Sequence, residues 1–191
     1  MELTKKLDLI KFSKIALLIL LGSLLLTVSA KVKIPFYPVP MTMQTFVVLF
    51  LGLAFGHKIG LATVTLYLLE GIFGLPVFAN SPEKGIGLIY FTGPTMGYLI
   101  GFLVAVYFAG LRRDLLVWSN YKYLNVLTVF SRLVLSVSFI YILGLLWLGY
   151  LIGWNKPIFE LGAQPFLLAE LFKLLLLTAL YPWIIKLNKI I

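Results

Sequence analysis

Glu170 and Lys173 are the residues of this chain whose type and spacing are best suited to chemistry, because they interrupt its last long apolar stretch. Three positions apart on a helix, they share one face. On insertion scales each charge near the centre of a bilayer costs about 2.5 to 3.5 kcal/mol. The pair therefore indicates a polar site inside a membrane protein. The alternative is that the two residues only form a mutually neutralising ion pair.

Three further polar residues are candidates for the same site: Gln44, Asn80 and Tyr98. Asparagine supplies a donor and an acceptor together, a glutamate accepts from N–H groups, and a lysine donates to a carbonyl or carboxylate. Each of the three has a structural reading as well. Asn80 precedes Ser81-Pro82 and suits a turn, whereas Gln44 and Tyr98 suit contacts between helices or anchoring at the interface.

The composition is that of a polytopic membrane protein. Of the 191 residues, 61% are hydrophobic and 12% are charged, whereas soluble domains have about 25% charged residues. The net charge of +9 comes from basic residues at the ends of apolar runs, so we expect no nucleic-acid partner. The chain has no cysteine and a single histidine, His57, which excludes disulfides and thiol nucleophiles. We expect no metal and no cofactor.

Six apolar stretches predict an all-α integral membrane protein with a single domain, a bundle of six transmembrane helices. The predicted segments are about 13–31, 43–56, 59–75, 92–111, 124–152 and 164–187. A full crossing needs about 20 residues, so the second and third segments are short. Only Gly56, His57 and Lys58 join them, which predicts a tight helical hairpin.

Two outer loops are unusual. Residues 31–42 read KVKIPFYPVPMT, and the three prolines favour a stiff, extended chain that lies over the protein or at the interface. Residues 72–91 form a second loop, long enough to fold back over the bundle.

The distribution of lysine and arginine predicts that both termini are cytoplasmic. In that orientation the outer loops hold only Lys31, Lys33, Lys84 and Lys156. The five candidate site residues then all fall in the outer half of the membrane. This arrangement predicts a pocket, open to the outside, for a small ligand with a polar head and an apolar body.

No catalytic motif is present: the sequence has no Gly-x-Ser-x-Gly elbow, no His–Glu zinc motif and no P-loop. We therefore expect the protein not to be an enzyme, and any pumping needs a partner or an ion gradient. Two hypotheses remain open. One is a ligand-binding transport subunit, and the other is a self-sufficient small permease in which Glu70 or the Glu170–Lys173 pair takes part in proton coupling.

Two pairs of small residues predict close helix packing. Gly97 and Gly101 form a Gly-x-x-x-Gly pattern on the fourth segment. On the first segment, Ser23 and Thr27 form a face that packs either within the chain or against another protein.

Four stretches resemble a known family. They are IPFYPVPMTMQTFVVLFLGLAF (residues 34–55), GIFGLPVFA (71–79) followed by Asn80, TGPTMGYLIGF (92–102) and PFLLAELFK (165–173). In order and spacing they resemble the biotin-specific substrate-binding subunits of energy-coupling factor transporters, the BioY family. Pro-Val-Pro-Met-Thr-x-Gln and Gly-Leu-Pro-Val-Phe-Ala together make the resemblance specific.

The resemblance implies a six-helix subunit of the prokaryotic cytoplasmic membrane that captures biotin from outside with high affinity. It implies as partners a transmembrane coupling subunit and two ATPase subunits. The family's ligand contacts fall on Asn80, Glu170 and Lys173, with Gln44 and Tyr98 at polar positions around the same pocket. The family's acidic residue is usually aspartate, and here Glu170 is one methylene longer.

The resemblance also bears on the first helix. In the family an Ala-x-x-x-Ala face on this helix meets the coupling subunit, and Ser23 and Thr27 fall at the corresponding positions here.

Overall fold

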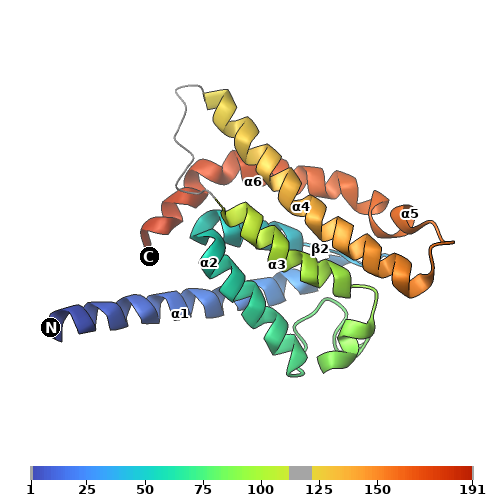
Figure 1. The fold of residues 1–191 in the computed structure, drawn as a ribbon, viewed down its shortest axis with the longest axis horizontal. Helices are drawn as coiled ribbons and strands as arrows, with labels where there is room; N and C mark the ends of the chain where they lie inside the picture. The colour runs from blue at the N-terminus through green and yellow to red at the C-terminus, as the bar shows by residue number, and fades with distance from the viewer. Residues whose placement is uncertain (1, 112–121, 191) are drawn as a thin grey trace.

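The fold is a bundle of α-helices, seen in a computed structural model that describes residues 2–111 and 122–190 (Figure 1). The helices are α1 (Glu2–Lys31), α2 (Gln44–Ile72), α3 (Met96–Gly110), α4 (Lys122–Ile152), α5 (Ile158–Gly162) and α6 (Leu167–Ile184). Short 3-10 turns cover Gly87–Thr92, Gln164–Phe166 and Ile185–Ile190.

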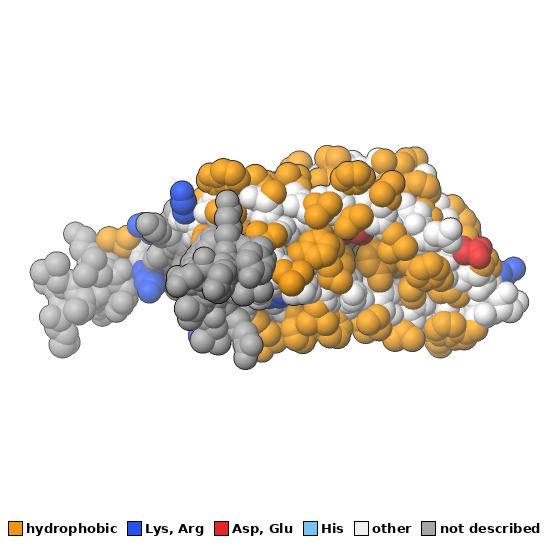
Figure 2. Space-filling model, turned by 90° about the horizontal axis from the view of Figure 1, so that it is seen from above, with side chains coloured by type: hydrophobic (Ala, Val, Ile, Leu, Met, Phe, Trp, Pro, Cys, Tyr) orange, Lys and Arg blue, Asp and Glu red, His pale blue; other side chains and the backbone are white. Residues whose placement is uncertain are grey.

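Within the described residues, four stretches are long and apolar enough to cross a membrane: Leu9–Lys31, Gln44–Ile72, Asn125–Ile152 and Ile158–Leu187. The helix Met96–Gly110 is apolar but shorter. Figure 2 shows apolar side chains over most of one face of the molecule, with most of the visible charged side chains toward its two ends. This distribution is the one expected of a multi-pass membrane protein.

Helix α2 folds back on itself at Gly56, as the sequence predicts. Gly56 has φ 80° and ψ 173°, a conformation that glycine adopts without steric cost. The two limbs are close enough that a Cβ on Gly60 would lie 3.5 Å from the Cα of Gly52. Gln44, at the start of the first limb, donates from Nε2 to the hydroxyl of Tyr67 on the second limb at 2.7 Å.

Helix α3 packs most extensively against α2 and α4, and it runs beside α4 in Figure 1. The predicted Gly-x-x-x-Gly pattern makes the contact with α4. A Cβ on Gly101 would lie 2.7 Å from the Cα of Ile140, and one on Gly97 would collide with the carbonyl of Leu143. The absence of side chains at these two positions allows the helices to approach closely.

The first outer loop contains a small antiparallel ribbon that the all-α expectation omitted. Strand β1 (Lys33–Ile34) pairs with β2 (Met41–Thr42), with Lys33 opposite Thr42. Two-residue strands leave no alternating pattern in the sequence. Val39, between the strands, is 5% exposed, so the loop does lie over the protein.

The second outer loop folds back over the bundle, as predicted, and buries Val77, Phe78 and Ala79.

Two helices end or begin at other residues than the sequence predicts, in each case next to glycine or proline. The third predicted segment ends at Ile72 rather than 75, and Gly74 then takes a positive φ of 92°. The fourth begins at Met96 rather than 92, directly after Gly93-Pro94-Thr95.

Candidate ligand-binding site

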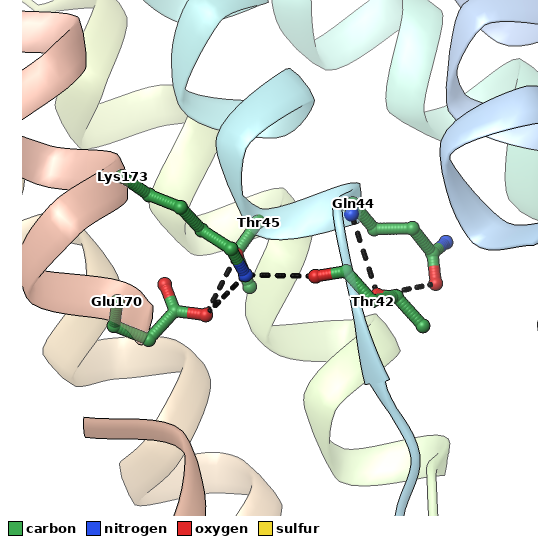
Figure 3. A network of polar contacts seen from close by, with 5 residues as sticks. All are labelled: Thr42, Gln44, Thr45, Glu170 and Lys173. Carbon is green, nitrogen blue, oxygen red and sulfur yellow. Dashed lines mark hydrogen bonds and ion pairs between the residues drawn. The ribbon is translucent and has the colours of Figure 1, made fainter. Parts of the chain in front are cut away.

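Glu170 and Lys173 form a buried ion pair on α6. Lys173 Nζ lies 2.7 Å from Glu170 Oε1, and the two side chains are only 6% and 8% exposed. Lys173 Nζ also donates to the backbone carbonyl of Thr42 at 2.7 Å and to Thr45 Oγ1 at 2.9 Å (Figure 3). An ammonium group has three hydrogens, so each hydrogen of Lys173 has an acceptor.

The two carboxylate oxygens of Glu170 have different surroundings. Oε1 accepts from Lys173 and, at 2.8 Å, from the hydroxyl of Thr45. Oε2 is buried and has no hydrogen-bond partner among the described residues. The Tyr141 hydroxyl interacts with the Glu170 carboxylate, but no donor among the described residues meets the distance and angle limits of a hydrogen bond to Oε2. A buried acceptor without a partner is costly, so Oε2 is suited to receive an N–H donor from a ligand.

Glu170 lines a cavity of about 550 Å³, a volume that includes its open mouth. The walls are aromatic and aliphatic, with a few polar groups. The residues that line the cavity are Val39, Pro40, Met41, Thr42, Gln44, Thr45, Phe78, Ala79, Tyr90, Thr95, Tyr98, Leu99, Phe102, Ile140, Tyr141, Phe166 and Glu170.

Gln44 and Tyr98 both line this cavity, yet their polar tips also hold the fold. The amide of Gln44 bonds to Tyr67, and its carbonyl oxygen accepts from the hydroxyl of Thr42 at 3.3 Å. The hydroxyl of Tyr98 donates to the carbonyl of Gly162 on α5 at 2.8 Å. Both residues therefore also have a structural role. The aromatic ring of Tyr98 forms part of the cavity wall.

Asn80 does not line the main cavity. It lines a smaller hollow of about 210 Å³, a volume that includes its open mouth. Two residues of that hollow, Tyr90 and Thr95, also line the main cavity. Its Oδ1 accepts from Lys33 Nζ at 3.1 Å. Asn80 therefore lies beside the main cavity. Lys173 bonds to Glu170 but is not among the residues that line the cavity.

Two lysines bind the second outer loop to the first. Lys33 Nζ donates to the carbonyl of Ala79 at 2.7 Å. Lys31 Nζ donates to the carbonyls of Phe78 and Ser81 at 2.7 and 2.8 Å. Because Phe78 and Ala79 line the cavity, these contacts hold part of its wall in place.

Sequence reasoning missed Thr45, which joins both members of the ion pair. The only signal for it was a pair of threonines, Thr42 and Thr45, between the proline-rich loop and an apolar run. The roles of Lys31 and Lys33 had no signal, because most of the groups that they bind are backbone carbonyls.

The structure places Ser23 against α2 rather than on the outer surface of α1. Ser23 is fully buried, and its hydroxyl bonds to Glu70 Oε1 at 2.9 Å. A Cβ on the neighbouring Gly22 would lie 2.6 Å from Thr63 Cγ2. Thr27 is half-buried and donates to the carbonyl of Ser23 at 3.0 Å. At Ser23, the small-residue face therefore packs within the chain.

Comparison with known proteins places the chain among its relatives. The model of the BioY family matches residues 4–189. A probable biotin transporter BioY of Pyrococcus horikoshii is 35% identical, over 78% of this chain and 82% of the relative. A biotin transporter BioY of Thermotoga maritima is also 35% identical, over 78% of this chain and 83% of the relative.

One solved structure has the same fold. It is the S-component for biotin from an ECF-type ABC transporter, which aligns with a TM-score of 0.66 and 24% identity over 97% of this chain and 93% of that chain. The family match over nearly the whole sequence and the shared fold agree with the resemblance carried by the four sequence stretches. The chain belongs to the BioY family.

Proposed function

We propose that this protein is the biotin-binding subunit, or S-component, of an energy-coupling factor transporter and that it takes up biotin. The observation that supports this most directly is a cavity with apolar walls that is lined by Glu170, whose Oε2 has no hydrogen-bond partner among the described residues. Relatives at 35% identity are named biotin transporters, and the solved S-component for biotin shares the fold.

The chemistry of biotin fits this cavity. Biotin has a ureido group with two N–H donors and one carbonyl, an apolar sulfur-containing ring and a flexible tail that ends in a carboxylate. We propose that a ureido N–H donates to Glu170 Oε2 while the rings pack against Phe78, Tyr98 and Phe166, which all line the cavity. Lys173 then has a positioning role, because its three hydrogens already hold Glu170, Thr42 and Thr45.

Asn80 and Gln44 complete the proposed site. The carbonyl oxygen of Asn80 faces Lys33, which leaves its amide hydrogens as donors for the ureido carbonyl or for the tail. Gln44 presents its buried amide at the cavity wall. These assignments place every proposed ligand contact at the same end of the bundle as the two outer loops.

The membrane arrangement is part of the proposal. We propose six crossings, with the two limbs of α2 as the second and third, both termini in the cytoplasm and the cavity open to the outside. A transmembrane coupling subunit and two ATPase subunits would energise uptake. Because Ser23 is buried, contacts of α1 with the coupling subunit would fall on Thr27 and the exposed leucines beside it, such as Leu20 and Leu24.

Biotin is expected to raise the melting temperature of the purified protein in detergent, because a ligand that binds only the folded state stabilises it. At a free concentration one hundred times Kd the gain is about 2.7 kcal/mol. Riboflavin at the same concentration serves as the control and is expected to produce no shift. A melting temperature that does not respond to saturating biotin contradicts biotin binding.

Uptake in liposomes separates the proposal from a self-sufficient permease. We expect biotin to accumulate only when the coupling subunit, the ATPase subunits and ATP are present. Accumulation by this chain alone, abolished when the proton gradient is collapsed, contradicts the proposed dependence on a coupling module.

Replacing both Lys31 and Lys33 by methionine is expected to weaken biotin binding by about tenfold, mainly through faster dissociation. The change removes the donors that hold the carbonyls of Phe78 and Ala79, each net bond being worth about 1 kcal/mol or more. Stopped-flow dissociation would measure the effect, with Lys156→Met, an exposed outer lysine, as the control. An unchanged dissociation rate contradicts the role given to the two lysines.

A further inference from the structure

The proposed function leaves the carboxylate of the biotin tail without a positively charged partner. Glu170 cannot supply one, because two carboxylates repel each other. The donor set of Lys173 is used within the protein, since its ammonium group already meets Thr42, Thr45 and Glu170. The tail of a ligand whose ureido group meets Glu170 therefore has to find its cation elsewhere.

The first outer loop offers two cations, and both are engaged. Lys31 Nζ donates to the carbonyls of Phe78 and Ser81 and lies 3.4 Å from Ser81 Oγ. Lys33 Nζ donates to Ala79 and Asn80. Drawing either lysine onto a ligand would release the loop that forms one wall of the cavity.

Lys84 is different. It is exposed, and among the described residues its ammonium group has no hydrogen bond or ion pair and lies 6.0 Å from the centre of the Tyr37 ring. Lys84 lines the hollow of about 210 Å³ together with Asn80, Tyr90, Gly93, Pro94 and Thr95. Tyr90 and Thr95 also line the main cavity, so the two spaces adjoin at these residues.

The electrostatics of the hollow favour an anion. Gly93, Pro94 and Thr95 lead directly into α3 (Met96–Gly110), so the positive end of this helix dipole lies at the hollow. Burial raises the pKa of the Tyr90 phenol, which keeps it neutral, and a neutral phenol can donate a hydrogen bond. Glu83 lies within electrostatic reach of both Tyr90 and Lys31, and the charge of Lys31 offsets that of Glu83.

An independent observation points to a ligand in the adjoining space. Glu170 is 5% exposed and lines the main cavity, and its Oε2 lacks a partner in the described part of the chain. The two adjoining spaces therefore have opposite character. A carboxylate oxygen that needs an N–H donor lines the main cavity, and Lys84, whose ammonium group has no ion pair among the described residues, lines the hollow.

We propose that Lys84 binds the carboxylate of the biotin tail in the hollow formed with Asn80, Tyr90 and Thr95, while the ureido group binds at Glu170. This inference rests on the proposed function and adds to it the orientation of the ligand and a residue that determines specificity. It assigns recognition of an acidic tail to the second outer loop, and recognition of the head to α6.

The test compares biotin with biotin methyl ester, which has the same rings but a neutral tail. Dissociation constants are measured for both ligands with the unchanged protein, Lys84→Met, Lys84→Gln and Lys84→Arg, and with Lys156→Met as a control for loss of an exposed outer lysine. We expect the unchanged protein to prefer biotin by about fivefold, the upper range for an exposed ion pair. Lys84→Met and Lys84→Gln should lose this preference by weakening biotin alone, and Lys84→Arg and Lys156→Met should keep it.

The other outcomes contradict either the assignment of Lys84 or the proposed function. A preference that survives in Lys84→Met and Lys84→Gln, or that is absent from the unchanged protein, overturns the assignment of Lys84. Equal weakening of biotin and its ester in both variants shows a merely structural role and also overturns it. If the unchanged protein binds neither ligand, the proposed function itself has failed. The preference should also shrink at high salt, because exposed charges are screened.

Discussion

Lys173→Met is expected to lower the free energy of unfolding by about 3 to 5 kcal/mol and to abolish measurable biotin binding. Removing one partner of a buried ion pair leaves the other charge uncompensated. Here the remaining charge would be that of Glu170, whose Oε2 already lacks a donor among the described residues. The change also removes donors from the Thr42 carbonyl and from Thr45 Oγ1, so the first outer loop loses its attachment to α6.

A double substitution separates the stability of the pair from its role in binding. Glu170→Gln combined with Lys173→Met removes both charges, and neutral replacements of a buried pair are often tolerated. We expect the double variant to be more stable than Lys173→Met alone and still unable to bind biotin. Thermal unfolding and titration with biotin in the same detergent would measure the two effects. A Lys173→Met protein with unchanged stability and affinity contradicts both roles.

The helices were predictable from the sequence because hydropathy reports directly on burial in lipid. The hairpin in α2 was predictable for a local reason as well. Gly56 lies between two apolar runs that are each too short to cross alone, and the structure turns the chain there with a φ of 80°. The close packing of α3 on α4 followed from Gly97 and Gly101 in the same way.

The polar contacts were predictable only in part, because most of them join residues that are far apart in the sequence. Thr45 and Glu170 are separated by 125 positions, and no local pattern places them together. Lys31 and Lys33 bind mainly carbonyls of the second outer loop, and every residue carries a carbonyl. The same holds for Ser23, because small residues predict close packing but do not identify the helix that makes the contact.

The site residues selected from the sequence also differ in how the structure uses them. Glu170 and Lys173 are joined in one network, whereas Asn80 lies in the neighbouring hollow. The hydroxyl of Tyr98 holds α5. Polar and charged residues in an apolar segment thus indicate where a site lies. Which of them bind the ligand and which support the fold depends on hydrogen bonds that form only in the folded chain.

Glu170→Gln is expected to weaken biotin binding by about 10- to 100-fold, and the network explains why this nearly isosteric change is severe. Lys173 and Thr45 both donate to Oε1, so they hold the amide oxygen of the new side chain at that position. The amide nitrogen then takes the place of Oε2 and presents hydrogens to the cavity, where a ureido N–H would meet a donor. The charged hydrogen bond that is lost is worth about 1.5 to 3 kcal/mol, and each 1.4 kcal/mol is about tenfold in Kd.

Glu170→Asp extends the same test, because it keeps the charge and moves it back by one methylene. We expect its affinity to lie between those of the unchanged protein and Glu170→Gln, since aspartate supplies the acceptor but alters its distance from Lys173. Isothermal titration with biotin would rank the variants, and Glu160→Gln, at an exposed position on α5, is the matched control. An affinity that is the same for Glu170→Gln as for Glu160→Gln contradicts a ligand bond at Oε2, because only the first of these changes removes a carboxylate oxygen that lines the cavity.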